Sequence, residues 1–181
     1  MKIAGNHRVY HARQSFRKQF DLTLDDLRDK TVFTAETEKI TRITLAKGDV
    51  TAVFEKETTK SQSGGNKKDG EEASAPETVV WKNAAGKVAN TGKIDKLLSS
   101  LKKLDCESFI EGKEKADFKD PIYTITLEGT VEHVLKIFEK INKSDRQHPA
   151  VSSKNDFAFR LPNWWVKRFM IDPDSLIEKD K

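Results

Sequence analysis

The residue types that most often bind metal ions or transfer protons are sparse in this chain. His7 and His11 are four residues apart, a spacing that would place two ligands on one face of a helix. The residues between them favour a strand and no third ligand lies nearby, so we interpret both as solvated histidines. His133 and His148 stand alone in the sequence, and we predict that both lie at the surface. We therefore expect no metal site.

Motifs for nucleophilic catalysis and for phosphate binding do not occur in the sequence either. It contains no Gly-x-Ser-x-Gly elbow, no Gly-x-x-x-x-Gly-Lys-Ser/Thr loop and no Gly-x-Gly-x-x-Gly turn. Cys106 is the only cysteine and has no histidine near it in sequence, which is typical of a half-buried structural thiol. The carboxylate pair Asp25 and Asp26 suits helix capping, and the pair Glu71 and Glu72 suits solubility. We predict no catalytic residue, no cofactor and no enzymatic activity.

One cluster near the C-terminal end indicates binding. Trp164 and Trp165 are followed by Lys167 and Arg168 in a segment that predicts a short helix. Because adjacent indoles project from different faces of a helix, we expect Trp165 in the core and Trp164 exposed beside the two cations. Such a group suits a protein partner or a membrane interface. We take Trp164, Lys167 and Arg168 as candidate partner-binding residues, although the sequence favours ordinary packing, including packing on a neighbouring repeat, over a functional contact.

The charge of the chain does not favour a nucleic-acid partner. Lys and Arg number 33 and Asp and Glu 29, a formal net charge of only +4 over 181 residues. Acidic residues interrupt nearly every basic stretch, whereas nucleic-acid-binding surfaces concentrate their cations. The N-terminal residues contain no apolar run after the first charge, so we expect no signal peptide and no membrane insertion by this segment.

The elements that would position these residues are mostly short strands. Residues 40–46 and 50–54 are rich in β-branched residues and flank a Lys-Gly-Asp turn, which predicts a β-hairpin. Further strands are expected near residues 78–82, 109–110, 122–127, 150–151 and 157–159, and short capped helices at 23–27 and 164–169. The clearest helix is predicted over residues 92–104, where five apolar residues share one stripe (Ile94, Leu97, Leu98, Leu101 and Leu104). The fold class is therefore α+β, with antiparallel β-hairpins packed on one amphipathic helix and short helices at both ends.

Two segments, residues 58–77 and residues 131–141, lack an unambiguous helix or strand pattern. Residues 58–77 contain almost no large apolar side chain, so we predict a disordered insertion there within a single domain that spans residues 1–181. Residues 131–141 fit the spacing of a helix and also the alternation of a strand, with Val131, His133, Leu135 and Ile137 on one strand face. The tight turn at Gly129 favours the strand.

The two ends of the chain resemble each other. Aligning Tyr10 with Phe159 pairs further residues of like type: Phe16 with Trp165, Phe20 with Phe169, Thr23 with Asp172, and Leu27 with Leu176. A repeat at the two edges indicates one full period plus the start of the next, so the parent protein is expected to carry tandem copies. The alternative is that the two ends lie side by side in one core.

The chain resembles the bacterial domain-of-unknown-function family 4340. The resemblance rests on five blocks of sequence: residues 25–33, 40–43, Trp81, 94–101 and 121–127, with the closing Phe-Arg-Leu-Pro at 159–162. Asp117 and Phe118 stand where the family often has a Gly-Leu pair. The resemblance implies an envelope protein with an N-terminal anchor, some members being related to auxiliary components of gliding-motility ABC transporters. This would make the present chain an excised segment that lies on the extracytoplasmic face of the membrane.

The leading functional hypothesis is therefore a non-enzymatic structural or interaction module of a bacterial cell-envelope protein, associated with an ABC transport or motility complex. Its expected partner is another protein or a neighbouring repeat. The alternatives are a domain that binds a small molecule or a glycan, and a hydrolase whose site is not recognisable in sequence. A cytoplasmic location is the alternative to the envelope.

Overall fold

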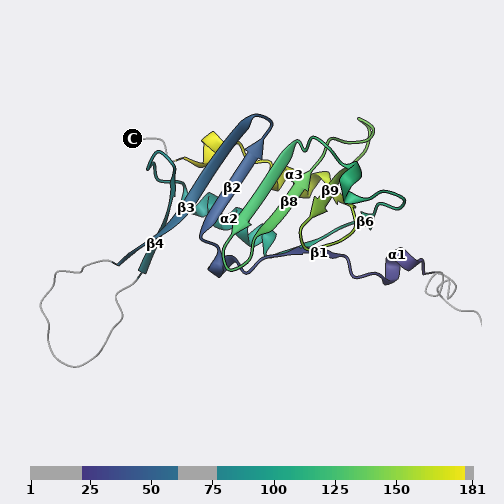
Figure 1. Ribbon diagram of the computed structural model, residues 1–181, viewed down its shortest axis with the longest axis horizontal. Helices are drawn as coiled ribbons and strands as arrows, with labels where there is room; N and C mark the ends of the chain where they lie inside the picture. Colours follow the sequence, from purple (N-terminus) through teal and green to yellow (C-terminus); the bar gives the residue numbers. More distant parts are fainter. Residues whose placement is uncertain (1–21, 61–76, 178–181) are drawn as a thin grey trace, which may run out of the picture.

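The computed structural model describes residues 22–60 and 77–177. Its main element is an antiparallel sheet of eight strands, in the spatial order β4-β3-β2-β7-β8-β9-β10-β6 (Figure 1). In chain order these strands are β2 (Arg42–Lys47), β3 (Val50–Lys60), β4 (Glu77–Asn83), β6 (Ser108–Phe109), β7 (Tyr123–Glu128), β8 (His133–Ile137), β9 (Gln147–Ser152) and β10 (Phe159–Pro162). A separate two-stranded sheet pairs β1 (Thr31–Thr34) with β5 (Lys103–Asp105).

Two meanders of consecutive strands make up most of the large sheet. Strands β2, β3 and β4 follow one another toward one edge, and β7, β8, β9 and β10 follow one another toward the other. They meet at the central pair β2 and β7, where Ile43 lies opposite Leu127 and Leu45 opposite Ile125. Strand β6 then adds to β10 at the far edge. The sheet is therefore one continuous structure in which the strands of the predicted hairpins take part.

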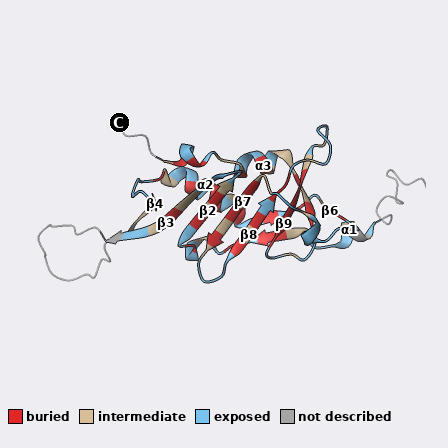
Figure 2. Ribbon diagram, turned by 45° about the horizontal axis from the view of Figure 1, so that its top comes forward, coloured by how far each residue is buried: buried red, intermediate tan, exposed pale blue. Residues whose placement is uncertain are grey.

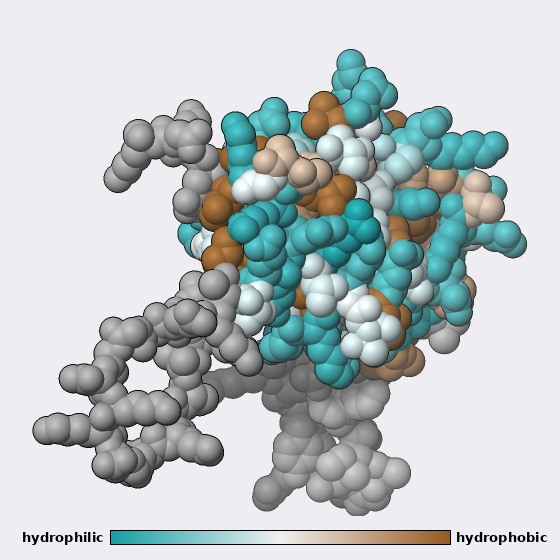
Figure 3. All heavy atoms as spheres, turned by 60° about the vertical axis from the view of Figure 1, so that its left-hand side comes forward, coloured by the Kyte–Doolittle hydropathy of each residue, from teal (hydrophilic) through white to brown (hydrophobic). Residues whose placement is uncertain are grey.

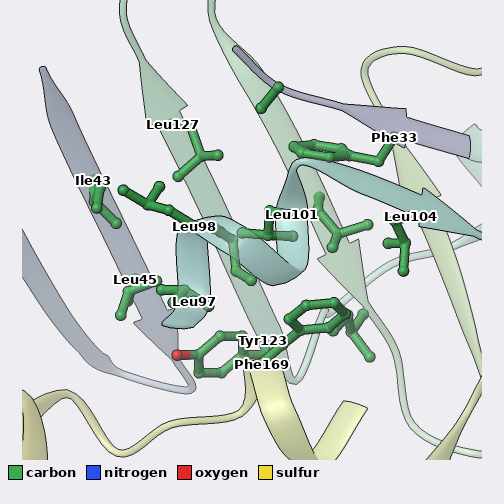
Figure 4. Close-up of a cluster of buried hydrophobic side chains, with 14 of the residues drawn as sticks. Phe33, Ile43, Leu45, Leu97, Leu98, Leu101, Leu104, Tyr123, Leu127 and Phe169 are labelled. Atoms are coloured by element: carbon green, nitrogen blue, oxygen red, sulfur yellow. The ribbon is translucent and has the colours of Figure 1, made fainter. Parts of the chain in front are cut away.

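The helical elements of the described residues lie in several parts of the chain. They are α1 (Leu24–Leu27), α2 (Thr91–Leu101), α3 (Asn163–Phe169) and the 3-10 turns η2 (Thr37–Lys39), η3 (Lys115–Asp117) and η4 (Pro173–Leu176). Helices α2 and α3 and the turn η4 pack on one face of this sheet, over the main hydrophobic core. Figure 4 shows side chains of α2 and α3, among them Leu101 and Phe169, meeting those of the strands in one cluster. Buried residues line the strands under the helices (Figure 2). The α+β class is confirmed, but α3 and η4 contribute to the core beside α2, so the helical layer is not one amphipathic helix.

The predicted hairpin at residues 40–54 is confirmed as β2 and β3. Lys47 pairs with Val50, which leaves a two-residue turn of Gly48 and Asp49. Gly48 has a φ of +56°, a left-handed conformation that glycine adopts without steric cost. Alternation along β2 then buries Ile43 and Leu45 and leaves Arg42 and Lys47 exposed.

The predicted central helix is confirmed, although it ends three residues earlier than expected. Asn90 caps α2 by accepting a hydrogen bond from the backbone N–H of Lys93 at 3.0 Å. The four apolar residues of its stripe up to Leu101 are buried. Leu104 is buried too, but as a residue of β5, where it pairs with Phe33. Leu104 therefore matches the spacing of the helical stripe only by coincidence, because it lies beyond the end of the helix.

The segment 131–141 forms strand β8 over His133–Ile137, so the hairpin interpretation is confirmed. Leu135 and Ile137 are fully buried and pair with Ile125 and Tyr123 of β7. Of the predicted insertion at 58–77, residues 58–60 and 77 belong to β3 and β4, and residues 61–76 lie outside the described residues. The strand expected between His7 and His11 lies outside them as well. Within the described part of the chain, no helix has the length and apolar character needed to cross a membrane.

Candidate functional site

Helix α3 holds the candidate partner-binding residues. Strand β10 ends at Pro162, whose fixed φ of −66° starts the helix without a side-chain cap. Val166 and Phe169 are buried and fasten one side of α3 to the sheet. Residues on the opposite side must then face solvent, and Trp164 is 54% exposed, with Lys167 and Arg168 also exposed.

Three rings and one guanidinium form what we call the aromatic stack: Trp164, Trp165, Phe169 and Arg168. The ring centroids of Trp164 and Trp165 are 4.5 Å apart with an interplanar angle of 28°, and those of Trp165 and Phe169 are 5.4 Å apart at 9°. The Arg168 guanidinium lies 5.5 Å from the Trp164 centroid and 5.4 Å from that of Trp165, within cation–π range. The structure thus brings Trp164 and Arg168 together, while Lys167 is exposed outside these contacts.

A groove between α2 and α3 adjoins the aromatic stack, because Arg168 belongs to both. This helix groove has a volume of about 600 Å³ and is lined by Leu97 and Ile171 together with polar and charged residues (Lys93, Asp95, Lys96, Ser99, Ser100 and Arg168). Its lining therefore carries three cations and one carboxylate. On the face shown in Figure 3, hydrophobic side chains occur in small groups among hydrophilic ones.

The prediction that His133 and His148 lie at the surface is wrong. They are only 7% and 9% exposed. His133 falls on the inward face of β8 with Leu135, and His148 on β9 has its Nδ1 2.9 Å from the carbonyl oxygen of Phe138. The alternation noted for the strand at 131–141 already places His133 beside Leu135 and was the available signal. Nothing comparable in the sequence marks His148.

His133 lines a pocket of about 370 Å³ at the end of the sheet, which we call the His133 pocket. Three lysines and two glutamates share its wall with small and apolar residues (Thr34, Ala35, Glu36, Glu38, Lys39, Ile40, Lys102, Thr130, Val131 and Lys154). Burial lowers the pKa of His133, and the nearby Lys154 lowers it further, against a weaker opposite effect of Glu36. Burial and Lys154 both favour the neutral form of the imidazole.

Cys106 and Asp26 occupy environments that are typical of residues with a structural role. Cys106 is buried, and burial raises the pKa of its thiol to about 11, so it carries little thiolate at neutral pH. Asp26 forms a capping box with Thr23: the Thr23 backbone N–H donates to Asp26 Oδ2 at 2.9 Å. Among residues 22–60 and 77–177, no three His, Cys, Asp or Glu side chains are grouped so that they could hold a metal ion. His7 and His11 lie outside these ranges.

The similarity between the two ends can be followed in part. Thr23 and Asp172, which the alignment pairs, both cap a single helical turn, α1 and η4. Their surroundings differ, because Leu27 is 67% exposed while its counterpart Leu176 is fully buried. The other paired residues of the N-terminal end lie before residue 22, outside the described part.

Fold and surface together define an antiparallel α+β domain that exposes an aromatic and cationic group beside a helical groove. The chain belongs to the family described as Domain of unknown function (DUF4340), whose sequence profile matches residues 1–121. The resemblance expected from the sequence is therefore shown, although the blocks at 122–127 and 159–162 lie beyond the matched residues. No curated protein and no solved structure matches the chain.

Proposed function

We propose that this domain is a non-enzymatic interaction module of a bacterial cell-envelope protein, and that it binds a protein partner through the aromatic stack and the helix groove. The family to which the chain belongs is one of unknown function, so the non-enzymatic role is part of the proposal. The envelope setting, the extracytoplasmic location and the service to an ABC transport or motility complex follow from the family resemblance alone.

The exposure of Trp164 carries this proposal. A half-exposed indole adds apolar area at an interface, and Trp and Arg are the residues most enriched among energetically dominant contacts. The stacking of Trp164 on Trp165 and of Arg168 over both rings holds these side chains in place before a partner arrives. Preorganised side chains lose less entropy on binding.

The lining of the helix groove indicates the chemistry of the partner. Leu97 and Ile171 offer an apolar surface, while Lys93, Lys96 and Arg168 outnumber the single carboxylate of Asp95. Complementary charge favours a segment that combines an apolar side chain with neighbouring acidic residues. We therefore expect an acidic and apolar protein segment as the occupant.

A peptide library displayed against the 181-residue chain tests this expectation. Selected peptides should combine acidic and apolar residues, and Trp164→Ala should weaken their binding about 30-fold, the effect of a dominant interface residue. Phe157→Ala is the matched control, because Phe157 is a similarly exposed aromatic residue outside the aromatic stack. Equal affinities of the two variants, or selected peptides without acidic residues, would contradict the proposal.

A second candidate function is favoured by the His133 pocket. Its volume falls within the range of small-molecule sites, and a buried histidine and charged side chains converge on it. This candidate corresponds to a small-molecule-binding domain and uses residues separate from those of the aromatic stack.

A further inference from the structure

The wall of the His133 pocket is fixed by close backbone packing. The turn between β7 and β8 passes directly over the residues that follow η2, and the backbone N–H of Thr41 donates to the carbonyl oxygen of Glu128 at 2.8 Å. A Cβ atom at Gly129 would lie 3.0 Å from the carbonyl carbon of Lys39 and 3.3 Å from the Cα of Ile40, and would overlap the Lys39 carbonyl oxygen. Because Gly129 has no side chain, the β7–β8 turn can approach the backbone of Lys39 and Ile40 this closely.

The charges around the pocket are only partly compensated. Lys39 pairs with Glu36 at 2.5 Å, and Lys102 pairs with Glu38 at 3.4 Å. Within the described residues Lys154 has no carboxylate at ion-pair distance, although it is close enough to His133 to lower the pKa of that residue. After the two pairs are counted, one positive charge remains at the pocket.

The imidazole of His133 lines the same pocket and can offer a hydrogen-bond donor. Nδ1 is buried and has no hydrogen-bond partner in the described part of the chain, whereas Nε2 is not among the buried unpartnered atoms. An Nε2–H tautomer leaves only a lone pair at the buried Nδ1, whereas the other tautomer would bury an N–H without an acceptor, so we assign the proton of the neutral ring to Nε2. The ring also packs on Phe33, with centroids 5.8 Å apart, which fixes its position. The pocket therefore combines a free ammonium group with an imidazole N–H.

We propose that the His133 pocket binds the oxyanion group of a small ligand, a carboxylate or a phosphate, with Lys154 as the counter-charge and the Nε2–H of His133 as a donor. This proposal rests on the second candidate function and names its ligand chemistry. A bound anion neutralises the uncompensated charge of Lys154 and accepts the unused hydrogen bond of His133. The hydroxyl groups of Thr34 and Thr130, which also line the pocket, can contribute further donors.

The proposal predicts that the ligand and a proton on His133 bind with positive coupling. An anion beside the ring stabilises its charged form, so occupancy should raise the pKa of His133 toward its ordinary value. The other charged groups around the pocket are Glu36, Glu38, Lys39 and Lys102. They are paired with each other in the structure and should contribute less to this change.

Nuclear magnetic resonance of the histidine side chains tests the proposal with two probes, inorganic phosphate and succinate. His133→Gln assigns the His133 signals among the four histidines of the chain. Saturable shifts of those signals at millimolar probe, together with a raised pKa, are expected; response to one probe alone tells a phosphate ligand from a carboxylate ligand. Lys154→Gln should weaken binding about tenfold, the effect of one lost charge-assisted contact.

Lys136→Gln is the matched control, because Lys136 is an exposed lysine on β8 itself, on the strand face opposite His133. No saturable shift with either probe, or equal weakening by Lys154→Gln and Lys136→Gln, would overturn the proposal. Since Trp164 and the helix groove are untouched in these variants, such a failure leaves the protein-binding proposal to its own experiment.

Discussion

Gly129 provides the sharpest test of the packing described above. Gly129→Ala adds one methyl group at the point where the β7–β8 turn crosses the backbone of Lys39 and Ile40. Backbone atoms cannot rotate away as a side chain can, so the turn itself must move. We expect overpacking to cost about 1–3 kcal/mol. Losing the hydrogen bond between Thr41 and Glu128 adds about 1 kcal/mol.

Gly92→Ala in helix α2 is the matched control. A Cβ atom there meets only the Asn90 side-chain oxygen, at an ordinary 3.5 Å. Alanine is the better helix former, so this variant should gain up to about 1 kcal/mol. The same chemical change is thus expected to have opposite effects at the two positions.

Urea unfolding followed by circular dichroism measures both effects. With a denaturant dependence of about 2 kcal/mol/M, Gly129→Ala should lower the midpoint by about 1–2 M, and Gly92→Ala should raise it slightly. A midpoint for Gly129→Ala within about 0.2 M of the unchanged chain would refute the close approach of the turn to Lys39, and with it the shape of the His133 pocket.

Three further results are expected. Leu101→Ala, in the fully buried stripe of α2, should cost about 2–5 kcal/mol of unfolding free energy, whereas Ile141→Ala at an exposed position should change it by less than about 0.5 kcal/mol; similar losses in denaturation curves would argue against the assigned core. Cys106, with its raised pKa and buried thiol, should react with a disulfide reagent far more slowly in the folded chain than in denaturant, and equal rates at pH 8 would disprove its burial. Because the folded-state pKa of His133 lies below its unfolded value, the unfolded chain takes up the proton first as pH falls below about 6.5, so stability should decrease there; His133→Gln should remove this part of the pH dependence, and an unchanged profile in that variant would contradict it.

Local patterns in the sequence predicted the local elements well. The Gly48 turn between two β-branched runs favours a hairpin, and the stripe from Ile94 to Leu101 defines one helical face. The end of α2 was misplaced because Leu104 is buried in either conformation. Spacing reports burial, and it does not distinguish the end of a helix from the start of a strand that leads into the same core.

The tertiary pairings could not be predicted in this way. Nothing near β2 in the sequence selects β7 as its neighbour, and β6 has only two residues with which to select β10. The two candidate sites differ in the same way: one depends on local structure and the other on contacts between distant segments. The exposure of Trp164 follows from helical geometry, but the His133 pocket depends on the turn at Gly129 meeting residues near Lys39, about 90 positions earlier.

The central strand pair also has a consequence for the kinetics of folding. The β2–β3 hairpin closes a two-residue turn, whereas pairing Thr44 with Thr126 closes a loop of roughly 80 residues. Strand pairs within each meander can therefore form early from neighbours in sequence, whereas the β2–β7 pairing closes the longest loop of the eight-stranded sheet. We therefore expect the β2–β7 pairing to limit the folding rate.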